Sequence, residues 1–123
     1  MSTVIFCLGF SLLIAHEMDA IAQSEWQLLY IFRKLPERIA APLFVAVHVP
    51  LFAFLLWLSI YPSSSIQQVS RLAIALFLII HAILHKRLDR HPHYTFHSTL
   101  SKSLIYGGGL VGFLYCTVSL MPY

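Results

Sequence analysis

Four long apolar segments alternate with short polar links along this chain. The segments cover residues 3–32, 39–61, 66–88 and 99–121. A helix that crosses a bilayer core of about 30 Å needs about 20 mostly apolar residues at 1.5 Å per residue. The pattern therefore predicts an all-α fold: a bundle of four transmembrane helices forming a single integral membrane domain over residues 1–123.

The composition changes this picture little, but it narrows the class of protein. Of the 123 residues, 59% are hydrophobic and 11% are charged, whereas soluble domains carry about 25% charged residues. An ordinary soluble enzyme and a disordered chain are therefore excluded. The lipid bilayer is the expected partner. Nucleic acid is not expected, because the basic residues lie against the membrane and no folded domain presents them.

The basic residues predict the orientation of the four helices. Cytoplasmic loops of membrane proteins carry the excess of lysine and arginine. Seven of the eight basic residues lie in the first and third links or within four residues of them, and only Arg71 lies elsewhere. We therefore expect both termini on the non-cytoplasmic side, in a bacterial inner membrane or a thylakoid. The seven are Arg33, Lys34, Arg38, Lys86, Arg87, Arg90 and Lys102.

Ionisable residues inside the apolar segments are the most informative feature. Each costs roughly 2.5–3.5 kcal/mol on insertion, so it faces the bundle interior and has a partner. Counting ~1.5 Å per residue from the first basic residue of each helix, Glu25, His48 and His81 lie ~12, ~15 and ~8 Å deep, with His85 nearer the surface. We expect Glu25, His48, His81 and His85 to bind zinc or iron. The alternative is that these residues only hydrogen-bond and fix the helix register.

A second group of ionisable residues is predicted in the outer half of the bundle. The same count places Asp19 at ~21 Å and Arg71 at ~22 Å. We therefore expect Arg71 to form an ion pair with Asp19 or Glu17, with His16 beside it. These residues would either neutralise one another's charge or hydrogen-bond to the metal ligands and orient them.

Two other functions fit the same residues, and the sequence does not decide whether the protein is an enzyme. The small-x-x-x-small pair Gly108 and Gly112 allows close approach of another helix, as in a non-catalytic subunit or assembly factor of a larger membrane complex. Haem b held by His48 and either His81 or His85 is chemically reasonable as well.

The run His16-Glu17-Met18-Asp19-Ala20, followed by Glu25-Trp26, resembles the H-E-x-D-A…E-W opening of a family of small bacterial integral membrane proteins. The histidine before proline in His48-Val49-Pro50 and the aromatic, histidine and serine stretch 94–101 extend the resemblance over nearly the whole chain. The family has no established activity. The resemblance therefore implies a four-helix fold and a set of functional positions, but no reaction.

Overall fold

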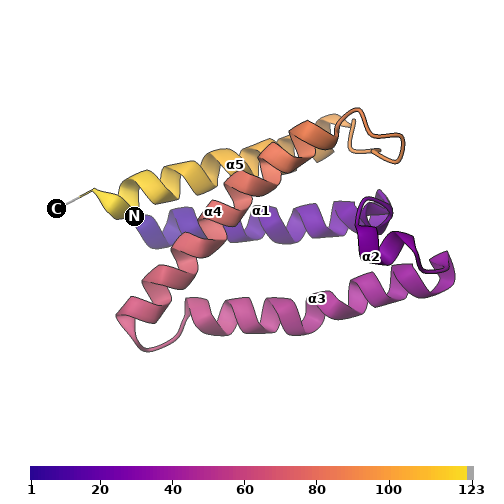
Figure 1. Ribbon diagram of the computed structural model, residues 1–123. Coiled ribbons are helices and arrows are strands. Elements are labelled where there is room, and N and C mark those ends of the chain that lie inside the picture. The colour runs from indigo at the N-terminus through magenta and orange to yellow at the C-terminus, as the bar shows by residue number, and fades with distance from the viewer. Residues whose placement is uncertain (122–123) are drawn as a thin grey trace.

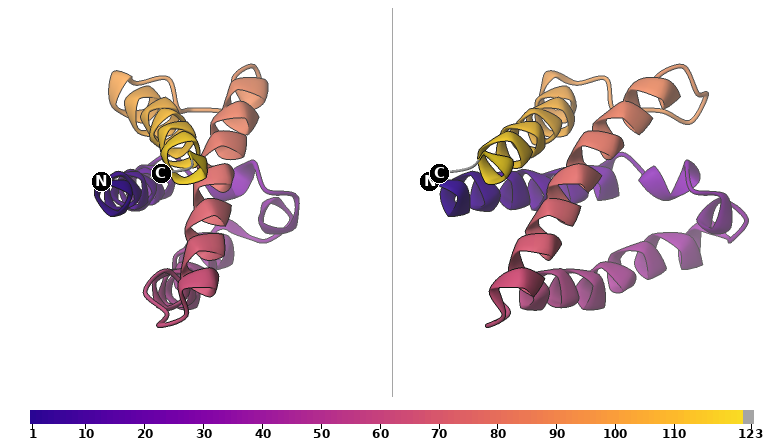
Figure 2. Two further views of the ribbon diagram at one scale, coloured as in Figure 1. Left: turned by 90° about the vertical axis from the view of Figure 1, so that its left-hand side faces the viewer. Right: turned by 60° about the vertical axis from the view of Figure 1, so that its left-hand side comes forward.

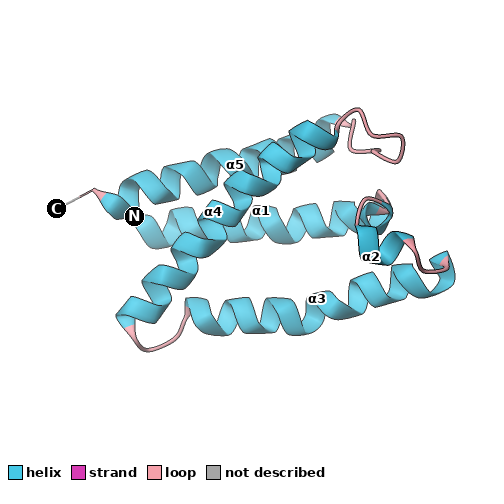
Figure 3. Cartoon of the chain, in the orientation of Figure 1, coloured by secondary structure: helices cyan, strands magenta, loops and turns pink. Residues whose placement is uncertain are grey.

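The computed structural model describes residues 1–121, and within them every regular element is a helix (Figure 3). Four helices in this range are long and apolar enough to cross a membrane. They are α1 (Ser2–Ala22), α3 (Glu37–Ser59), α4 (Ser64–Leu88) and α5 (Thr99–Leu120). A 3-10 segment η1 (Glu25–Gln27) and a single-turn helix α2 (Tyr30–Arg33) join α1 to α3. The predicted all-α fold with four apolar helices is confirmed.

The four long helices are not mutually parallel. Helices α1, α3 and α5 run along the molecule, whereas α4 crosses them obliquely from the end of α3 to the start of α5 (Figure 1). The end-on view shows α1 and α5 together on one side of α4 and α3 at the other end of its length (Figure 2). The start of α1 and the end of α5 lie at one end of the molecule, and links 23–36 and 89–98 lie at the opposite end (Figure 1). The basic links therefore share one end.

The first apolar segment is not a single helix over 3–32, because α1 ends at Ala22. Ser24 adopts a left-handed conformation, with φ 55° and ψ 45°, that turns the chain out of the helical path. Such a conformation costs a non-glycine residue about 1–2 kcal/mol. The Thr95 hydroxyl, from the link before α5, donates a hydrogen bond of 2.9 Å to the Gln23 carbonyl at this break. The left-handed turn at Ser24 thus ends α1 and begins the link to η1.

Helices α4 and α5 approach each other closely because α5 lacks side chains along the contact. A Cβ atom at Gly112 would lie 2.5 Å from the carbonyl oxygen of Ala75, and one at Gly109 would lie 2.8 Å from the Cβ of Ala82. Gly108 and Gly112 are both buried. Their face is filled by α4 of the same chain, so it is not available as the docking surface that the small-residue pattern suggested.

The buried apolar side chains form two clusters, and the outer faces of the helices are apolar too. One cluster lies toward the chain ends and the other toward the links. On α3, Val49 is 71% exposed and Phe54 is 54% exposed, which suits contact with lipid and would be unfavourable in water. The first cluster comprises Phe6, Phe10, Leu13, Ile74, Ala75, Leu78 and Tyr115, and the second Ala20, Trp26, Ala40, Phe44, Tyr94, Phe96 and Ile105.

Candidate metal centre

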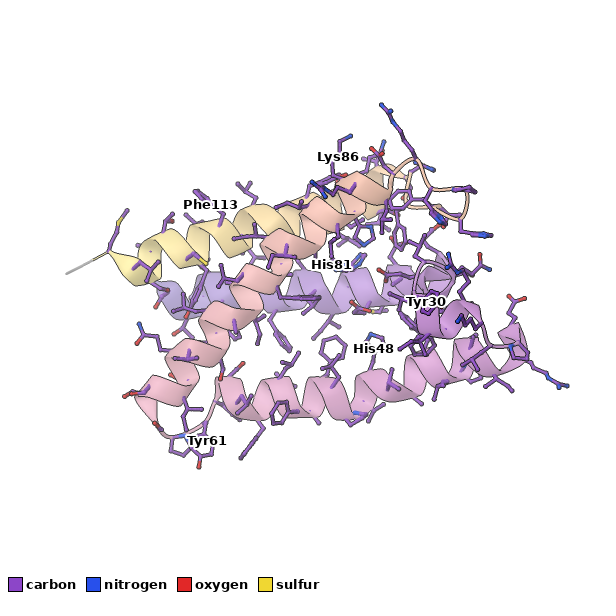
Figure 4. All side chains as sticks on the ribbon, in the orientation of Figure 1. Tyr30, His48, Tyr61, His81, Lys86 and Phe113 are labelled. Carbon is purple, nitrogen blue, oxygen red and sulfur yellow. The ribbon has the colours of Figure 1, made fainter. Side chains whose placement is uncertain are left out.

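Four ionisable side chains meet at the end of the bundle that carries the links. His81 and His85 are one turn apart on α4 and therefore share a face. His16 comes from the last third of α1, and the turn at Ser24 brings Glu25 of η1 back beside it. His16, Glu25 and His85 are buried, with 2%, 8% and 2% of their surface exposed. Figure 4 shows His81 on the half of α4 that leads toward the link before α5.

The donor atoms of the four side chains converge. The Nε2 atom of His81 lies 2.8 Å from Nε2 of His16 and 3.1 Å from Nε2 of His85. Glu25 places Oε1 3.3 Å from Nε2 of His85 and 4.0 Å from that of His81. Its Oε2 lies 3.9 Å from Nε2 of His16. Each residue thus offers one ligand atom, and these atoms all lie within 4.8 Å of one another.

These separations match the edges of a tetrahedral coordination sphere. Zinc bonds to imidazole nitrogen and carboxylate oxygen at about 2.0–2.2 Å, so the ligand atoms around it are about 3.4 Å apart. The observed contacts run from 2.8 to 4.0 Å and bracket that value. The four donor atoms, which all lie within 4.8 Å of one another, would have to move toward equal spacing to surround one ion.

Hydrogen bonding alone does not satisfy the three imidazoles. A ring nitrogen carries either one proton or one lone pair, so Nε2 of His81 makes one good hydrogen bond. It nevertheless faces two other ring nitrogens at hydrogen-bonding distance. It must therefore share its one proton or one lone pair between two neighbours, which weakens each hydrogen bond. A cation among the three rings would instead let each Nε2 lone pair point at the ion.

The outward nitrogens of two of the imidazoles suit such an arrangement. With Nε2 directed inward, Nδ1 carries the hydrogen, and an acceptor for it orients the ring. Nδ1 of His85 lies 3.1 Å from the hydroxyl oxygen of Tyr94. Nδ1 of His16 and Oδ2 of Asp19 are both buried and have no hydrogen-bond partner among the described residues. Asp19 stands one turn further along α1, where its carboxylate is the available acceptor for His16.

Aromatic side chains shield the cluster from water. Phe96 lies 4.7 Å from the ring of His85 and 5.6 Å from that of His16, measured between centroids. Phe77 stacks on His81 at 5.1 Å with an interplanar angle of 30°. Phe96 is only 1% exposed. In such surroundings the effective dielectric constant is low, so interactions of a cation with its ligands are strengthened.

The interfacial groups of the site have protonation states that suit ligation. Burial by itself raises the pKa of the Glu25 carboxyl. The hydrogen bond from His85 and the charges of the neighbouring imidazoles outweigh burial, so this pKa lies below its ordinary value. Burial, reinforced by neighbouring anionic groups, raises the pKa of Tyr94 to about 12. At neutral pH Glu25 is therefore an ionised carboxylate and Tyr94 a neutral hydroxyl.

His48 does not belong to the cluster, contrary to the sequence prediction, and His16 takes its place. Nε2 of His48 lies 2.9 Å from Oε2 of Glu17, and its Nδ1–H donates to the Phe44 carbonyl at 2.5 Å. Glu17 follows His16 directly, so it projects about 100° further around α1 and meets α3 instead of α4. His48 and His81 thus belong to separate groups, and haem ligated by both is not favoured.

The predicted ion pair of Arg71 with Asp19 or Glu17 is also absent from the described residues. Arg71 donates to the carbonyl of Ser59 at 3.1 Å and to the hydroxyl of Thr3 at 3.2 Å. Thr3 is 16 residues from Asp19, which is ~24 Å along α1. Oδ1 of Asp19 instead accepts a hydrogen bond of 3.4 Å from Gln23.

Both corrections have the same physical cause. The sequence-based depths in the first helix were counted from Arg33, on the assumption of one helix over 3–32. Because α1 ends at Ala22, the residues from there to Arg33 do not continue it, and the ~16 Å of helical rise that the count assigned to them does not apply. The missing rise brings His16 level with His81 and moves Asp19 away from Arg71.

Reasoning from the residues themselves gave no role in the site to two of its members, although the family resemblance had included the stretch 94–101. Tyr94 and Phe96 come from the link before α5, which is too polar and too short to suggest a buried element. Both are nevertheless buried, at 6% and 1% exposure. The available signal was the alternation of aromatic and polar side chains in Tyr94-Thr95-Phe96-His97. Such alternation is typical of an extended segment with one face against a core.

Comparisons with known proteins identify a family but no reaction. No curated protein and no solved structure matches the chain. A family model described as a family of unknown function, DUF6713, matches residues 2–121 and so includes all four long helices and the whole histidine cluster. The chain therefore belongs to the DUF6713 family of unknown function.

Proposed function

We propose that this membrane protein binds one divalent transition metal ion, zinc in the first place, through His16, Glu25, His81 and His85. The observation that carries the proposal is the convergence of four donor atoms within 4.8 Å of one another. The donors come from three separate elements, α1, η1 and α4. Chance packing of a mostly apolar chain does not favour such a concentration of polar atoms, because each one is costly to bury.

Zinc is the ion that the donor set suits best. Imidazole with carboxylate suits zinc or non-haem iron. Neither cysteine is part of the cluster, so the soft thiolate ligands that select copper(I) are absent from it. Four protein donors, of which three residues are buried, match a closed structural zinc site, whereas a catalytic site keeps one position open.

A metal at this position would join three separate elements of the fold. Glu25 of η1 already contacts His81 and His85 of α4. Four ligands from α1, η1 and α4 would fix the interfacial turn to the bundle. Metal binding free energy would then appear as folding free energy, by about 2.7 kcal/mol when free metal is 100 times its Kd.

Metal analysis of purified protein tests this proposal. The protein is isolated in detergent with an affinity tag that contains no histidine, and zinc and iron are quantified by mass spectrometry. We expect about one metal ion per chain and loss of it in His81→Asn, with helicity retained. His91→Asn, a histidine of the link outside the cluster, is the matched control. Protein that is metal-free and gains no thermal stability from added zinc would overturn the proposal.

A further inference from the structure

Three cationic side chains surround a pocket where the end of α4, the link 89–98 and the start of α5 meet. They are Lys86, Arg90 and Lys102. The volume of the pocket is about 460 Å³, which is within the usual range of about 300–1,000 Å³ for small-molecule sites. The link 89–98 lies at the end of the molecule that carries both basic links (Figure 1). The pocket is therefore expected at the level of the lipid head groups.

The pocket carries a positive charge that its own carboxylate does not neutralise. Among the described residues that line it, Asp89 is the one carboxylate, and its Oδ2 lies 2.8 Å from Nζ of Lys86. Within residues 1–121, neither Arg90 nor Lys102 forms an ion pair. With His97 neutral, three cations and one anion leave a net charge of +2. Arg90 and Lys102 are therefore available to bind an anion.

The helix surface that continues from the pocket is apolar and exposed. Tyr106 and Phe113 follow Lys102 by four and eleven residues, so at 100° per residue the three lie within about 40° on one face of α5. Phe113 is 59% exposed and lies ~16 Å along the helix from Lys102, about half of a bilayer core of about 30 Å. Figure 4 shows Lys86 and Phe113 on the side of the molecule away from α3. The same side thus combines positive charge at its end with an apolar surface one leaflet deep.

We propose that this pocket binds the phosphate group of an anionic phospholipid, with Arg90 and Lys102 on the phosphate oxygens and the acyl chains along the exposed face of α5. A guanidinium group matches two phosphate oxygens at once, and an ammonium group supplies a compact charge for a third. Basic pockets between transmembrane helices bind lipid head groups in this way. The adjoining apolar face favours a phosphate that carries acyl chains over a soluble phosphate compound.

The charge of the pocket also distinguishes among phospholipids. Phosphatidylcholine and phosphatidylethanolamine carry an ammonium group close to the phosphate. In this pocket that group would meet a net positive charge, and the carboxylate of Asp89 is already paired with Lys86. A head group without an ammonium, as in phosphatidylglycerol, avoids this repulsion. The pocket therefore selects lipids whose head group is anionic as a whole.

The lipid site is separate from the metal centre, although the two are neighbours. Neither Arg90 nor Lys102 belongs to the four-donor cluster. Tyr94 and Phe96 line the pocket and also contact His85, so they form a wall that the two sites share. Lipid binding and metal content are measured separately on the same samples, so either proposal can fail alone.

Native mass spectrometry tests the lipid site. The full chain in a mild detergent is titrated with phosphatidylglycerol or with phosphatidylcholine of the same acyl chains, and the lipids bound per chain are counted. We expect one phosphatidylglycerol per chain to bind at least about tenfold more tightly than phosphatidylcholine. Millimolar inorganic phosphate or glycerol 3-phosphate should not displace it.

Variants that remove one charge locate the bound lipid. Arg90→Gln and Lys102→Gln should each weaken phosphatidylglycerol binding about fivefold, as for one basic residue near a membrane surface. Both residues are exposed, so their replacement leaves the buried core intact. Arg87→Gln is the matched control, because Arg87 is exposed on the same end of α4 and does not line the pocket. This variant should bind phosphatidylglycerol as wild type does.

Three results would overturn the proposal. Equal binding of the two lipids would show general contact with lipid and no site for a head group. An equal loss of binding in Arg87→Gln and Arg90→Gln would show attraction to the overall surface charge. Displacement of phosphatidylglycerol by inorganic phosphate or glycerol 3-phosphate would assign the pocket to a soluble phosphate compound instead of a lipid.

Discussion

One added methyl group at Gly112 tests the closest helix contact of the fold. The new Cβ atom would lie 2.5 Å from the carbonyl oxygen of Ala75 and 3.2 Å from the Cβ of Leu78. Because the obstacle is helix backbone, relief requires α5 to move away from α4 by several tenths of an ångström. Overpacking of this kind costs about 1–3 kcal/mol, while alanine gains at most about 1 kcal/mol in helix propensity. We expect Gly112→Ala to lower the unfolding free energy by about 1–2 kcal/mol.

Two neighbouring glycines supply the controls for this prediction. At Gly107 the nearest atom is 4.0 Å from the added Cβ, so Gly107→Ala should stabilise by up to about 1 kcal/mol. At Gly109 the obstacle is the Cβ of Ala82, at 2.8 Å, and Ala82→Gly should recover part of the loss in Gly109→Ala. Stability is measured by denaturing-detergent titration in mixed micelles, followed by circular dichroism. Equal stability of the Gly112 and Gly107 variants would refute the close contact of α4 with α5.

Three further predictions follow from the same structure. Tyr94→Phe keeps the ring but removes the hydroxyl that receives a ligand's Nδ1–H, so zinc affinity should fall at least about tenfold in competitive chelator titration; an unchanged affinity would mean that the hydroxyl does not orient the ligand. The effects of Asp19→Asn and Arg71→Met on stability should add within about 0.5 kcal/mol in a double-mutant cycle, because these residues do not touch; a larger coupling would restore the ion pair that the sequence suggested. With both native cysteines replaced by alanine, Ser2→Cys should react with an impermeant maleimide in intact cells and His91→Cys should not, if the basic links face the cytoplasm; the reverse pattern would invert the predicted orientation.

The fold could be predicted because its strongest determinant, the length of each apolar run, is visible in the sequence alone. Hydropathy and segment length identify helices that must cross a bilayer. Three of the four apolar segments begin and end within a few residues of the observed helices. The first segment extends well beyond the observed end of α1. Residues 26–32 include Trp26, Leu28, Leu29, Tyr30, Ile31 and Phe32 and are apolar enough to extend a membrane helix. The left-handed turn at Ser24 ends α1, and a hydropathy pattern contains no signal for such a turn.

The candidate site was predicted only in part for the same reason. His81 and His85 share a face through helical periodicity alone, and the carboxylate of Glu25 was assigned to them from its depth. The choice between His16 and His48 depended on the vertical register of α1 against α4, and the break at Ser24 determines that register. The contribution of Tyr94 required the path of an irregular link, for which one sequence contains no periodic signal.

Metal stoichiometry in two single-histidine variants tests the central claim most directly. His16→Gln and His48→Gln each remove one imidazole from the apolar part of the bundle, and zinc and iron are quantified per folded chain against wild type. Our account predicts loss of bound metal in His16→Gln and about one ion per chain in wild type and in His48→Gln. Metal retained in His16→Gln but lost in His48→Gln would contradict the ligand set, and metal absent from all three proteins would contradict the metal centre itself.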